Sequence, residues 1–513
     1  MVAVRHRLNH RSQREWQCYT FRMTTLAALP FDNHFARLGP EFSTSLSPPP
    51  LPEPYLVSAN ADVAALFDLD PGQLRSPEFI GMVSGNWLPP GAEPIAMLYA
   101  GHQFGHYVPQ LGDGRAILLG QVRNARDETW DLQLKGAGAT PYSRMADGRA
   151  VLRSTIREYL CSEAMHHLGI PTSRALGIVG SDFPVLRETV ETAAVLLRVA
   201  PSHVRIGSFE VFFYRNQPQH VRTLADYVIR QHFPEIAEAP GSSASHLAFL
   251  REVIVRTARM IAHWQAVGFA HGVMNTDNMS ILGLTFDYGP YGFVEAYDPD
   301  FICNHADDSG RYAFSNQPTI AVWNLCCLAQ ALTPLLTVEE CRTVLADFEP
   351  GYRAVYAQLF RAKLGLRTVR DEDARLMADL LEILQGNAVD YPRFFRALSA
   401  FNSAADAPNT GVTQLFRYPE AFQFWSVGYR ARLAQESVPD AERHSAMRAV
   451  NPRYVLRNWL AQRAIERAQQ KDFTEIDRLL DVLRRPFDDQ PGFDEYARPA
   501  PEDFLVPEVS CSS

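Results

Sequence analysis

Three oxygen-bearing side chains that lie close together in the sequence could hold a divalent cation. Asp277 and Asn278 are neighbours in the stretch from His271 to Ser280, and Asp287 follows at the start of Asp287-Tyr288-Gly289. Cations such as Mg²⁺ take carboxylate and carbonyl oxygens from proteins and phosphate oxygens from substrates. Asp-Asn and Asp-x-Gly sequences are also common in turns. Because the two segments occur together, we favour a metal and phosphate site over two unrelated turns.

The order of these residues resembles the catalytic segment of protein kinases. That segment is written H-R-D-x-x-x-x-N and is followed by D-F-G. His271 matches its first position, Asn278 matches the metal-binding Asn, and Asp287-Tyr288-Gly289 matches D-F-G. The catalytic Asp of the template falls on Val273, which cannot accept a proton. The sequence therefore predicts the phosphate-and-metal half of a kinase site without the usual base.

A strand that ends in a lysine could place a positive charge near this site. Residues 130–135 alternate between apolar and polar types, as a half-buried strand does, and end at Lys135. Lysine occurs only at 135, 363 and 471. Lys135 therefore either marks a site that needs a compact positive charge or is a surface residue retained by chance. The turn from Gly112 through Gly114 to Arg115 precedes this strand, and it is either a plain hairpin turn or a phosphate-binding loop.

The next two elements carry further charged candidates. Residues 150–168 have the apolar period of a helix, on which Glu158 is either an ion-pair partner of Lys135 or a solvated side chain. Asp147-Gly148-Arg149 precedes this helix and could lie near a nucleotide. Arg198 interrupts the apolar strand 193–200, where it must either reach the surface or meet a phosphate.

From about residue 223 onward the pattern is helical. A face that includes Leu250, Ile254 and Trp264 ends at Gly268, directly before the His271 segment. We expect an α+β, protein-kinase-like fold of two lobes, strand-rich over 23–200 and helical over 201–500. Residues 1–22 are a doubtful N-terminal extension, and 501–513 form a tail that contains Cys511. Further helices are expected near 318–333, 337–348, 350–364, 370–386, 453–469 and 473–484.

Composition excludes several classes of protein. The 513 residues are 46% hydrophobic and 21% charged, with ample material for a core. The net charge of −9 argues against nucleic-acid binding, and no apolar run reaches the ~20 residues that span a bilayer. The seven cysteines include no C-x-x-C pair, so a zinc site is not expected. We expect a monomeric, cytoplasmic bacterial protein that acts away from membranes.

Longer stretches resemble one family, the selenoprotein O (SelO, or YdiU) protein adenylyltransferases. The resemblance runs from about Phe31 to the C-terminus. Its most specific stretches are Tyr99 to Gly105, Leu134 to Arg144, His271 to Ser280, Asp287 to Gly292, and the terminal Cys511-Ser512-Ser513.

The resemblance implies a kinase-like fold that binds ATP in the reversed orientation and transfers AMP to Ser, Thr or Tyr hydroxyls of proteins. Asp277 would be the proton acceptor, while Asn278 and Asp287 would hold Mg²⁺, for which Mn²⁺ could substitute. Asp287 would also contact the nucleotide. The other nucleotide-binding residues implied by the resemblance are Gly112, Gly114, Arg115, Lys135, Asp147, Gly148, Arg198 and Arg205.

Two other functions and one regulatory feature stay open at this point. A pseudokinase scaffold would bind nucleotide without catalysis, and a conventional phosphotransferase would transfer the γ-phosphate. Cys303 follows the Asp287 segment and Cys511 lies in the tail, so the two thiols either form a regulatory disulfide or are ordinary unpaired cysteines.

Overall fold

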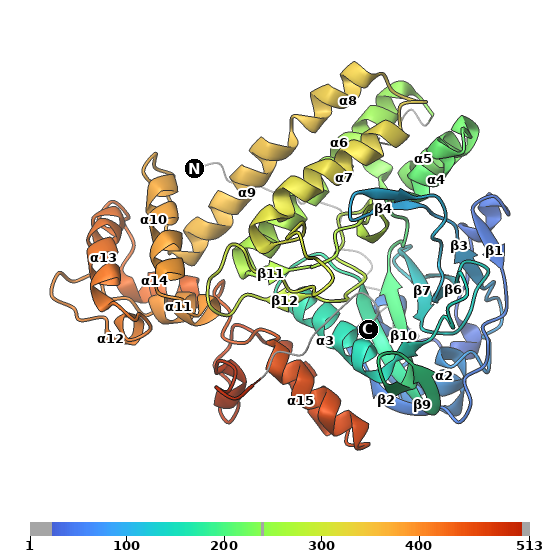
Figure 1. The fold of residues 1–513 in the computed structure, drawn as a ribbon, viewed down its shortest axis with the longest axis horizontal. Coiled ribbons are helices and arrows are strands. Elements are labelled where there is room, and N and C mark those ends of the chain that lie inside the picture. The colour runs from blue at the N-terminus through green and yellow to red at the C-terminus, as the bar shows by residue number, and fades with distance from the viewer. Residues whose placement is uncertain (1–22, 237–240, 505–513) are drawn as a thin grey trace, which may run out of the picture.

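An antiparallel sheet occupies the N-terminal part of the chain, and helices form most of the rest (Figure 1). The computed structural model describes residues 23–236 and 241–504. The expected α+β composition, with strands first and helices later, is confirmed. The proposed extension 1–22 and Cys511 lie outside the described residues.

The sheet has a continuous path of strands in the order β1-β3-β6-β7-β10-β9-β2, and β8 pairs with β10. The pairings are antiparallel throughout. The strand bounds are β1 Ser43–Ser45, β2 Tyr55–Ala59, β3 Ile95–Met97, β6 Ala116–Arg123, β7 Thr129–Lys135, β8 Ala150–Val151, β9 Arg174–Leu186 and β10 Val190–Ala200.

The register of β7 and β10 brings the two predicted cationic residues to one face of the sheet. Arg198 on β10 lies opposite Gln133 on β7, and Lys135 lies two residues further along β7. Since alternate residues of a strand share a face, and directly paired residues do too, Lys135, Gln133 and Arg198 lie on the same side. The intervening Leu132 and Leu134 lie in the apolar core on the other side, together with residues of helix α2, Pro77–Val83.

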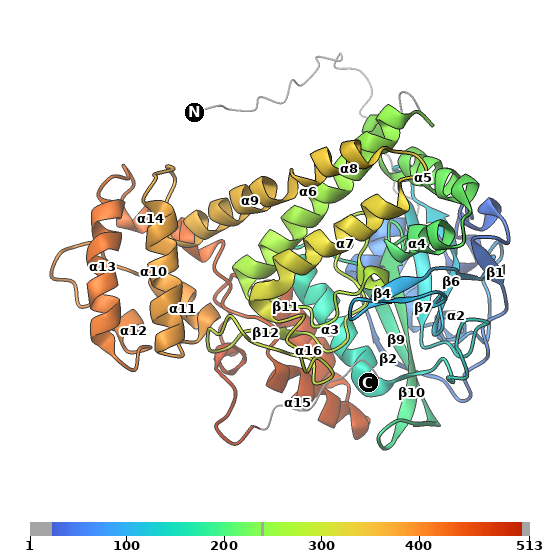
Figure 2. The same cartoon turned by 45° about the horizontal axis from the view of Figure 1, so that its top comes forward.

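Helix α3, Leu152–His167, packs against β9 and β10 on the face that carries Lys135. It confirms the helix predicted over 150–168 and places Glu158 against the sheet. Two helices from the C-terminal end of the chain, α15 (Asn458–Gln469) and α16 (Thr474–Leu483), pack against α3 (Figure 2). The position of Glu158 therefore depends on segments some 300 residues apart in the sequence.

The helical part is built around α6, Ser243–Val267, which ends as predicted at Gly268 in the left-handed conformation. The chain then enters β11, Phe269–Ala270, which pairs with β12, Gly292–Phe293. This short pair closes the segment that contains Asp277 and Asp287 into one loop. The remaining helices of this body are α4 Gly207–Tyr214, α5 Pro218–His232, α7 Gln317–Ala331, α8 Val338–Leu345 and α9 Phe348–Lys363.

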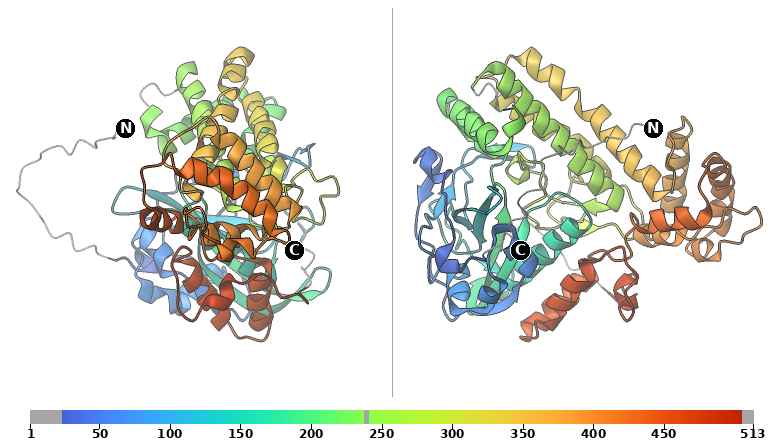
Figure 3. Two further views of the ribbon diagram at one scale, coloured as in Figure 1. Left: turned by 90° about the vertical axis from the view of Figure 1, so that its left-hand side faces the viewer. Right: turned by 180° about the vertical axis from the view of Figure 1, so that it is seen from behind.

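A group of helices lies at the far end of the molecule from the sheet, over an apolar core that also includes residues of α9 and β11 (Figures 1 and 3). It comprises α10 Asp373–Gly386, α11 Tyr391–Leu398, α12 Thr410–Thr413, α13 Pro419–Leu433 and α14 Asp440–Arg448. Of these, the sequence analysis predicted only α10, because the others are short or lack a clear apolar period. Helix α4 was also not predicted. None of the helices in the described part of the chain is both long enough and apolar enough to span a bilayer.

Lys363, at the end of α9, is a buried lysine in an aromatic environment. Its side chain is 5% exposed, and its Nζ lies 4.1 Å from the centre of the Phe395 ring. Burial lowers the pKa of Lys363 to about 7. Between pH 7 and the ordinary lysine pKa of about 10.4, the unfolded chain holds a proton that the folded chain has released. The free energy of unfolding therefore rises with pH across this window.

We expect Lys363→Met to raise the free energy of unfolding on the order of 2 kcal/mol at pH 6, because the substitution removes the buried charge and keeps the chain length. The gain should shrink as the pH approaches 10. Urea unfolding at pH 6 and pH 9 measures both values. Lys471→Met is the control, because Lys471 is half exposed and pairs with Asp182. An equal effect of Lys363→Met at both pH values would contradict the prediction.

Candidate functional site

A cavity of about 800 Å³ lies where the sheet meets the helical part. Residues from both parts line it, so it is formed only when they come together. Its walls include all the predicted nucleotide, metal and proton-accepting residues: Gly112, Gly114, Arg115, Lys135, Asp147, Gly148, Arg198, Arg205, Asp277, Asn278 and Asp287.

Glu158 holds two cations of the sheet together beside this cavity. Its Oε2 accepts from Lys135 Nζ at 2.5 Å, and its Oε1 accepts from Arg198 Nε at 2.5 Å. The ion pair of Lys135 with Glu158 is thus present, and the solvated alternative for Glu158 is excluded by its burial. Arg198 does not reach the surface but lines the cavity, so its contact with a phosphate stays a prediction. It is buried between the carboxylates of Glu158 and Asp287, which the apolar pattern of its own strand could not reveal.

Asp287 joins the helical part to these cations. Its Oδ1 lies 2.5 Å from Arg198 Nη2 and 3.9 Å from Lys135 Nζ, and its Oδ2 lies 3.0 Å from Arg205 Nη1. Although burial opposes ionisation, Arg198 and Arg205 hold the pKa of Asp287 well below its usual range. The backbone of Asp287 is left-handed, with φ of +59°, which is uncommon for a residue other than glycine. The surrounding ion pairs compensate for this conformation.

The cavity wall carries more cations than carboxylates: seven lysine and arginine side chains line it, against Asp113, Asp147, Asp277 and Asp287. Lys135, Arg198 and Arg205 face the two carboxylates of Glu158 and Asp287, and all three cations are less than 9% exposed. Burial lowers the pKa of Lys135 to about 8, although Glu158 opposes that shift. Because cations outnumber carboxylates on this wall, it favours an anionic ligand such as phosphate.

The glycine-rich turn and the loop before α3 border the cavity on the side of the sheet. Gly112 has a φ of +67°, and a Cβ atom there would lie 2.4 Å from Cγ of Tyr142. A larger residue would therefore displace Tyr142 from the cavity wall. Asp147 accepts two hydrogen bonds from Arg187, at 2.8 and 3.0 Å, and this ion pair lowers the pKa of Asp147. Arg187 also lines the cavity and was not predicted.

Asp277 lies on the loop between β11 and β12, and its buried carboxylate lines the cavity. It is 7% exposed, and burial raises its pKa to about 7 even though Arg205 opposes the shift. Its Oδ2 accepts a hydrogen bond of 3.2 Å from Gln103 Nε2. Its Oδ1 is buried and has no hydrogen-bond partner among the described residues. Asp277 can therefore accept a proton or bind a cation.

His271 and Asn278 hold the loop in shape. His271 Nε2 donates to the carbonyl oxygen of Phe286 at 3.0 Å, which ties the start of the loop to the residue before Asp287. Asn278 Nδ2 donates to the carbonyl oxygen of Val273 at 3.1 Å, so its Oδ1 is the atom that can act as a ligand. Val273, which falls on the catalytic Asp of the kinase template in the sequence, also lines the cavity.

The donor set on this loop fits a hard divalent cation. It offers the unpartnered Oδ1 of Asp277, the amide oxygen of Asn278 and the carboxylate of Asp287. These are the oxygen types that Mg²⁺ prefers. The oxygens of Asp287 already accept from two arginines, but a carboxylate has further lone pairs and can also bind a cation.

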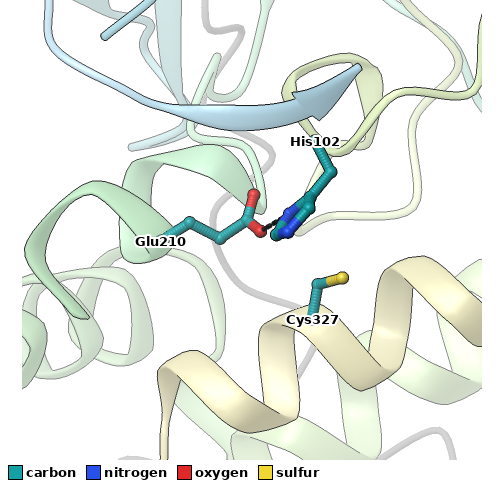
Figure 4. Close-up of side chains that lie close together, drawn as sticks. All are labelled: His102, Glu210 and Cys327. Atoms are coloured by element: carbon teal, nitrogen blue, oxygen red, sulfur yellow. Dashed lines mark hydrogen bonds and ion pairs between the residues drawn. The ribbon is translucent and has the colours of Figure 1, made fainter. Parts of the chain in front are cut away.

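A second group of metal-ligand types lies outside the cavity. Ligand atoms of His102, Glu210 and Cys327 are within 4.8 Å of one another, and all three residues are buried (Figure 4). The sequence analysis did not identify this group, because the three residues are far apart in the chain. His102 and Gln103 belong to the stretch Tyr99 to Gly105, which was noted for its resemblance but was given no role.

Cys303 lies against Gly272 and is not among the residues that line the cavity in the described part of the chain. Its Sγ donates to the carbonyl oxygen of Ala270 at 3.5 Å, and a Cβ atom at Gly272 would lie 2.7 Å from that sulfur. Because Cys511 is outside the described residues, the disulfide between them stays a prediction.

The site therefore defines an α+β protein with a buried cationic cavity and an oxygen-rich loop, as expected of an enzyme that handles phosphate groups. Comparison with known proteins agrees: the family model described as "Protein adenylyltransferase SelO" matches residues 25–484. The chain belongs to this family and is a nucleotidyltransferase.

Several curated relatives are similar to the chain over nearly its whole length. A "Protein nucleotidyltransferase YdiU" of Myxococcus xanthus is 57% identical over 491 residues, which is 96% of this chain and 100% of the relative. Proteins of the same name from Thiobacillus denitrificans and Thioalkalivibrio sulfidiphilus are 55% and 56% identical, with the same shares covered. The resemblance to the SelO family is thus confirmed.

We expect Glu158→Gln to lower the free energy of unfolding by about 3 kcal/mol, because the substitution leaves two buried cations without their shared carboxylate. Urea unfolding at pH 7 measures the change. Glu442→Gln is the matched control, since Glu442 forms an exposed ion pair with Arg367, and it should cost less than about 1 kcal/mol. Equal losses for the two variants would show that the Glu158 network does not stabilise the fold.

Proposed function

We propose that this nucleotidyltransferase transfers AMP from ATP to a Ser, Thr or Tyr hydroxyl of a protein and releases pyrophosphate. One observation carries the proposal: the cavity presents the cations Lys135, Arg198 and Arg205 opposite the oxygen ligands of the Asp277 loop. Membership of the adenylyltransferase family supports AMP as the transferred group.

The cationic wall suits the phosphates of ATP. The guanidinium groups of Arg198 and Arg205 are fixed by Asp287, and the Lys135 ammonium is fixed by Glu158. Charges held in place before the reaction stabilise negative charge on phosphate oxygens without reorganising. Gly112, Gly114, Arg115, Asp147 and Gly148 are proposed to complete the nucleotide site from the glycine-rich turn and the adjoining loop.

Asn278 and Asp287 are proposed to hold Mg²⁺. The ion, when bound, would neutralise charge on the phosphate oxygens and fix their orientation. Mn²⁺ accepts the same oxygen ligands and could replace it.

Asp277 is proposed as the proton acceptor. Its pKa of about 7 lies near the pH at which a general base is most effective, and its Oδ1 is free to take a proton. The oxygen of the acceptor hydroxyl attacks the α-phosphorus and forms a new P–O bond. The bond from the α-phosphorus to the bridging oxygen breaks, pyrophosphate leaves with that electron pair, and the hydroxyl proton passes to Asp277.

We expect ATP labelled at the α-phosphate to label protein, and ATP labelled at the γ-phosphate to leave protein unlabelled. Incubation with Mg²⁺ and a mixture of acceptor proteins, followed by electrophoresis and mass spectrometry of labelled peptides, measures both. Label from the γ-phosphate would instead show a conventional phosphotransferase. Binding of ATP without either label would favour a pseudokinase scaffold.

We expect Asp287→Ala to abolish AMP transfer, with a loss on the order of 10²-fold or more, because it removes a cation ligand and releases both arginines. Lys135→Ala should reduce transfer at least about tenfold through the loss of a phosphate contact. Transfer rates measured with α-labelled ATP test both. Lys471→Ala, at an exposed ion pair outside the cavity, is the matched control. Full activity of Asp287→Ala would contradict the proposed site.

A further inference from the structure

A short hairpin lies directly on the loop that carries Asp277. It consists of β4, Gly101–Gln103, and β5, His106–Val108. A Cβ atom at Gly101 would lie 2.7 Å from Oδ1 of Asp277 and 3.0 Å from its Cβ, so the backbone of β4 touches the carboxylate. Gln103 Nε2 donates to Oδ2 of the same carboxylate at 3.2 Å. The hairpin thus fixes one oxygen of Asp277 and leaves the other without a partner among the described residues.

Backbone hydrogen bonds continue this contact along the loop. The N–H of His102 donates to Oγ1 of Thr276 at 2.7 Å, and the N–H of Phe104 donates to Oδ1 of Asn275 at 3.2 Å. Residues 102–104 of the hairpin therefore bind residues 275–277 of the loop. A shift of the hairpin would move Asp277 with it.

The buried carboxylate of Glu210, on α4, anchors the hairpin to the loop. Its Oε1 lies 2.5 Å from Nδ1 of His102 (Figure 4). Its Oε2 accepts a hydrogen bond from the hydroxyl of Thr276. Glu210 is fully buried, and a buried carboxylate is costly unless its oxygens are hydrogen-bonded. This cost penalises any arrangement in which His102 or Thr276 moves away.

Two of these side chains, His102 and Glu210, could instead be taken with Cys327 for a metal site. Two ligands of a tetrahedral zinc ion, each about 2.0–2.1 Å from the metal, lie roughly 3.4 Å apart. Nδ1 of His102 and Oε1 of Glu210 are only 2.5 Å apart, which is the distance of a hydrogen bond. The geometry therefore favours a proton between them over a metal ion.

We propose that Gln103 is a positioning residue that orients Asp277 for proton acceptance, and that His102, Glu210 and Thr276 anchor the hairpin from which Gln103 acts. This inference rests on the proposed function, in which Asp277 is the proton acceptor. Gln103 would act through Asp277 and not on the nucleotide, so its loss should affect turnover more than ATP binding.

We expect Gln103→Leu to lower kcat for AMP transfer at least tenfold while KM for ATP and the Tm stay within twofold and 2 °C of the wild-type values. Gln435→Leu is the matched control, because Gln435 Nε2 donates to the carboxylate of Glu372 at 3.0 Å on the surface of the outlying helices. Unchanged kcat for Gln103→Leu, with transfer by the wild type intact, would overturn this inference alone. Absence of transfer by the wild type would count against the proposed function instead.

A double-mutant cycle separates positioning from a general structural role. If Gln103 acts through Asp277, Gln103→Leu should cause no further loss in an Asp277→Asn background. Losses that multiply in the double variant would show that Gln103 acts independently of Asp277, and would overturn the inference.

The anchor is tested by a pair of variants at Thr276. Thr276→Val removes the hydroxyl and should lower kcat at least tenfold, and Thr276→Ser, which restores the hydroxyl, should recover most of that loss. Metal analysis of the purified protein by mass spectrometry should find no stoichiometric zinc. One equivalent of zinc that is lost on Cys327→Ser would overturn the anchor in favour of a metal site.

Discussion

The ion network of Glu158, Lys135, Arg198 and Asp287 is the interaction on which the rest of the site depends. Glu158 joins helix α3 to two strands, and Asp287 joins those strands to the loop of the helical part. Each carboxylate contacts more than one cation, and Glu158, Lys135 and Arg198 are buried, so the loss of one member leaves a buried charge without its partner. The network thus sets the distance between the cationic wall and the oxygen-rich loop.

The long-range packing of the fold supports this network. Helix α3 is packed between the sheet and the C-terminal helices α15 and α16. These late segments of the chain thereby hold Glu158 in position. The pairing of β11 with β12 closes the loop that presents Asp277 and Asp287. The outlying helices α10–α14 pack on an apolar core that they share with Ala270 of β11 and Phe360 of α9, and none of their residues is among those that line the cavity in the described part of the chain.

Two different environments tune the two aspartates of the loop. Cations surround Asp287 and keep it ionised. Burial raises the pKa of Asp277 to about 7, although Arg205 and the hydrogen bond from Gln103 oppose that shift. The first environment suits a permanent ligand and the second suits a group that exchanges a proton. The hairpin β4–β5 also holds one of the two aspartates in place, because Gln103 and the backbone at Gly101 contact Asp277.

The sequence by itself determined the chemistry of the site and most of its regular elements. Local patterns can be recognised from the sequence alone. They include the spacing of His271, Asn278 and Asp287, the alternation that ends at Lys135 and the helical period around Glu158. Only the tertiary structure decided how charges far apart in the chain are paired. The carboxylate partners of Arg198, the contact of Gln103 with Asp277 and the cluster of His102 with Glu210 join residues 40 to 174 positions apart. Such contacts depend on strand register and helix packing, which no local pattern encodes.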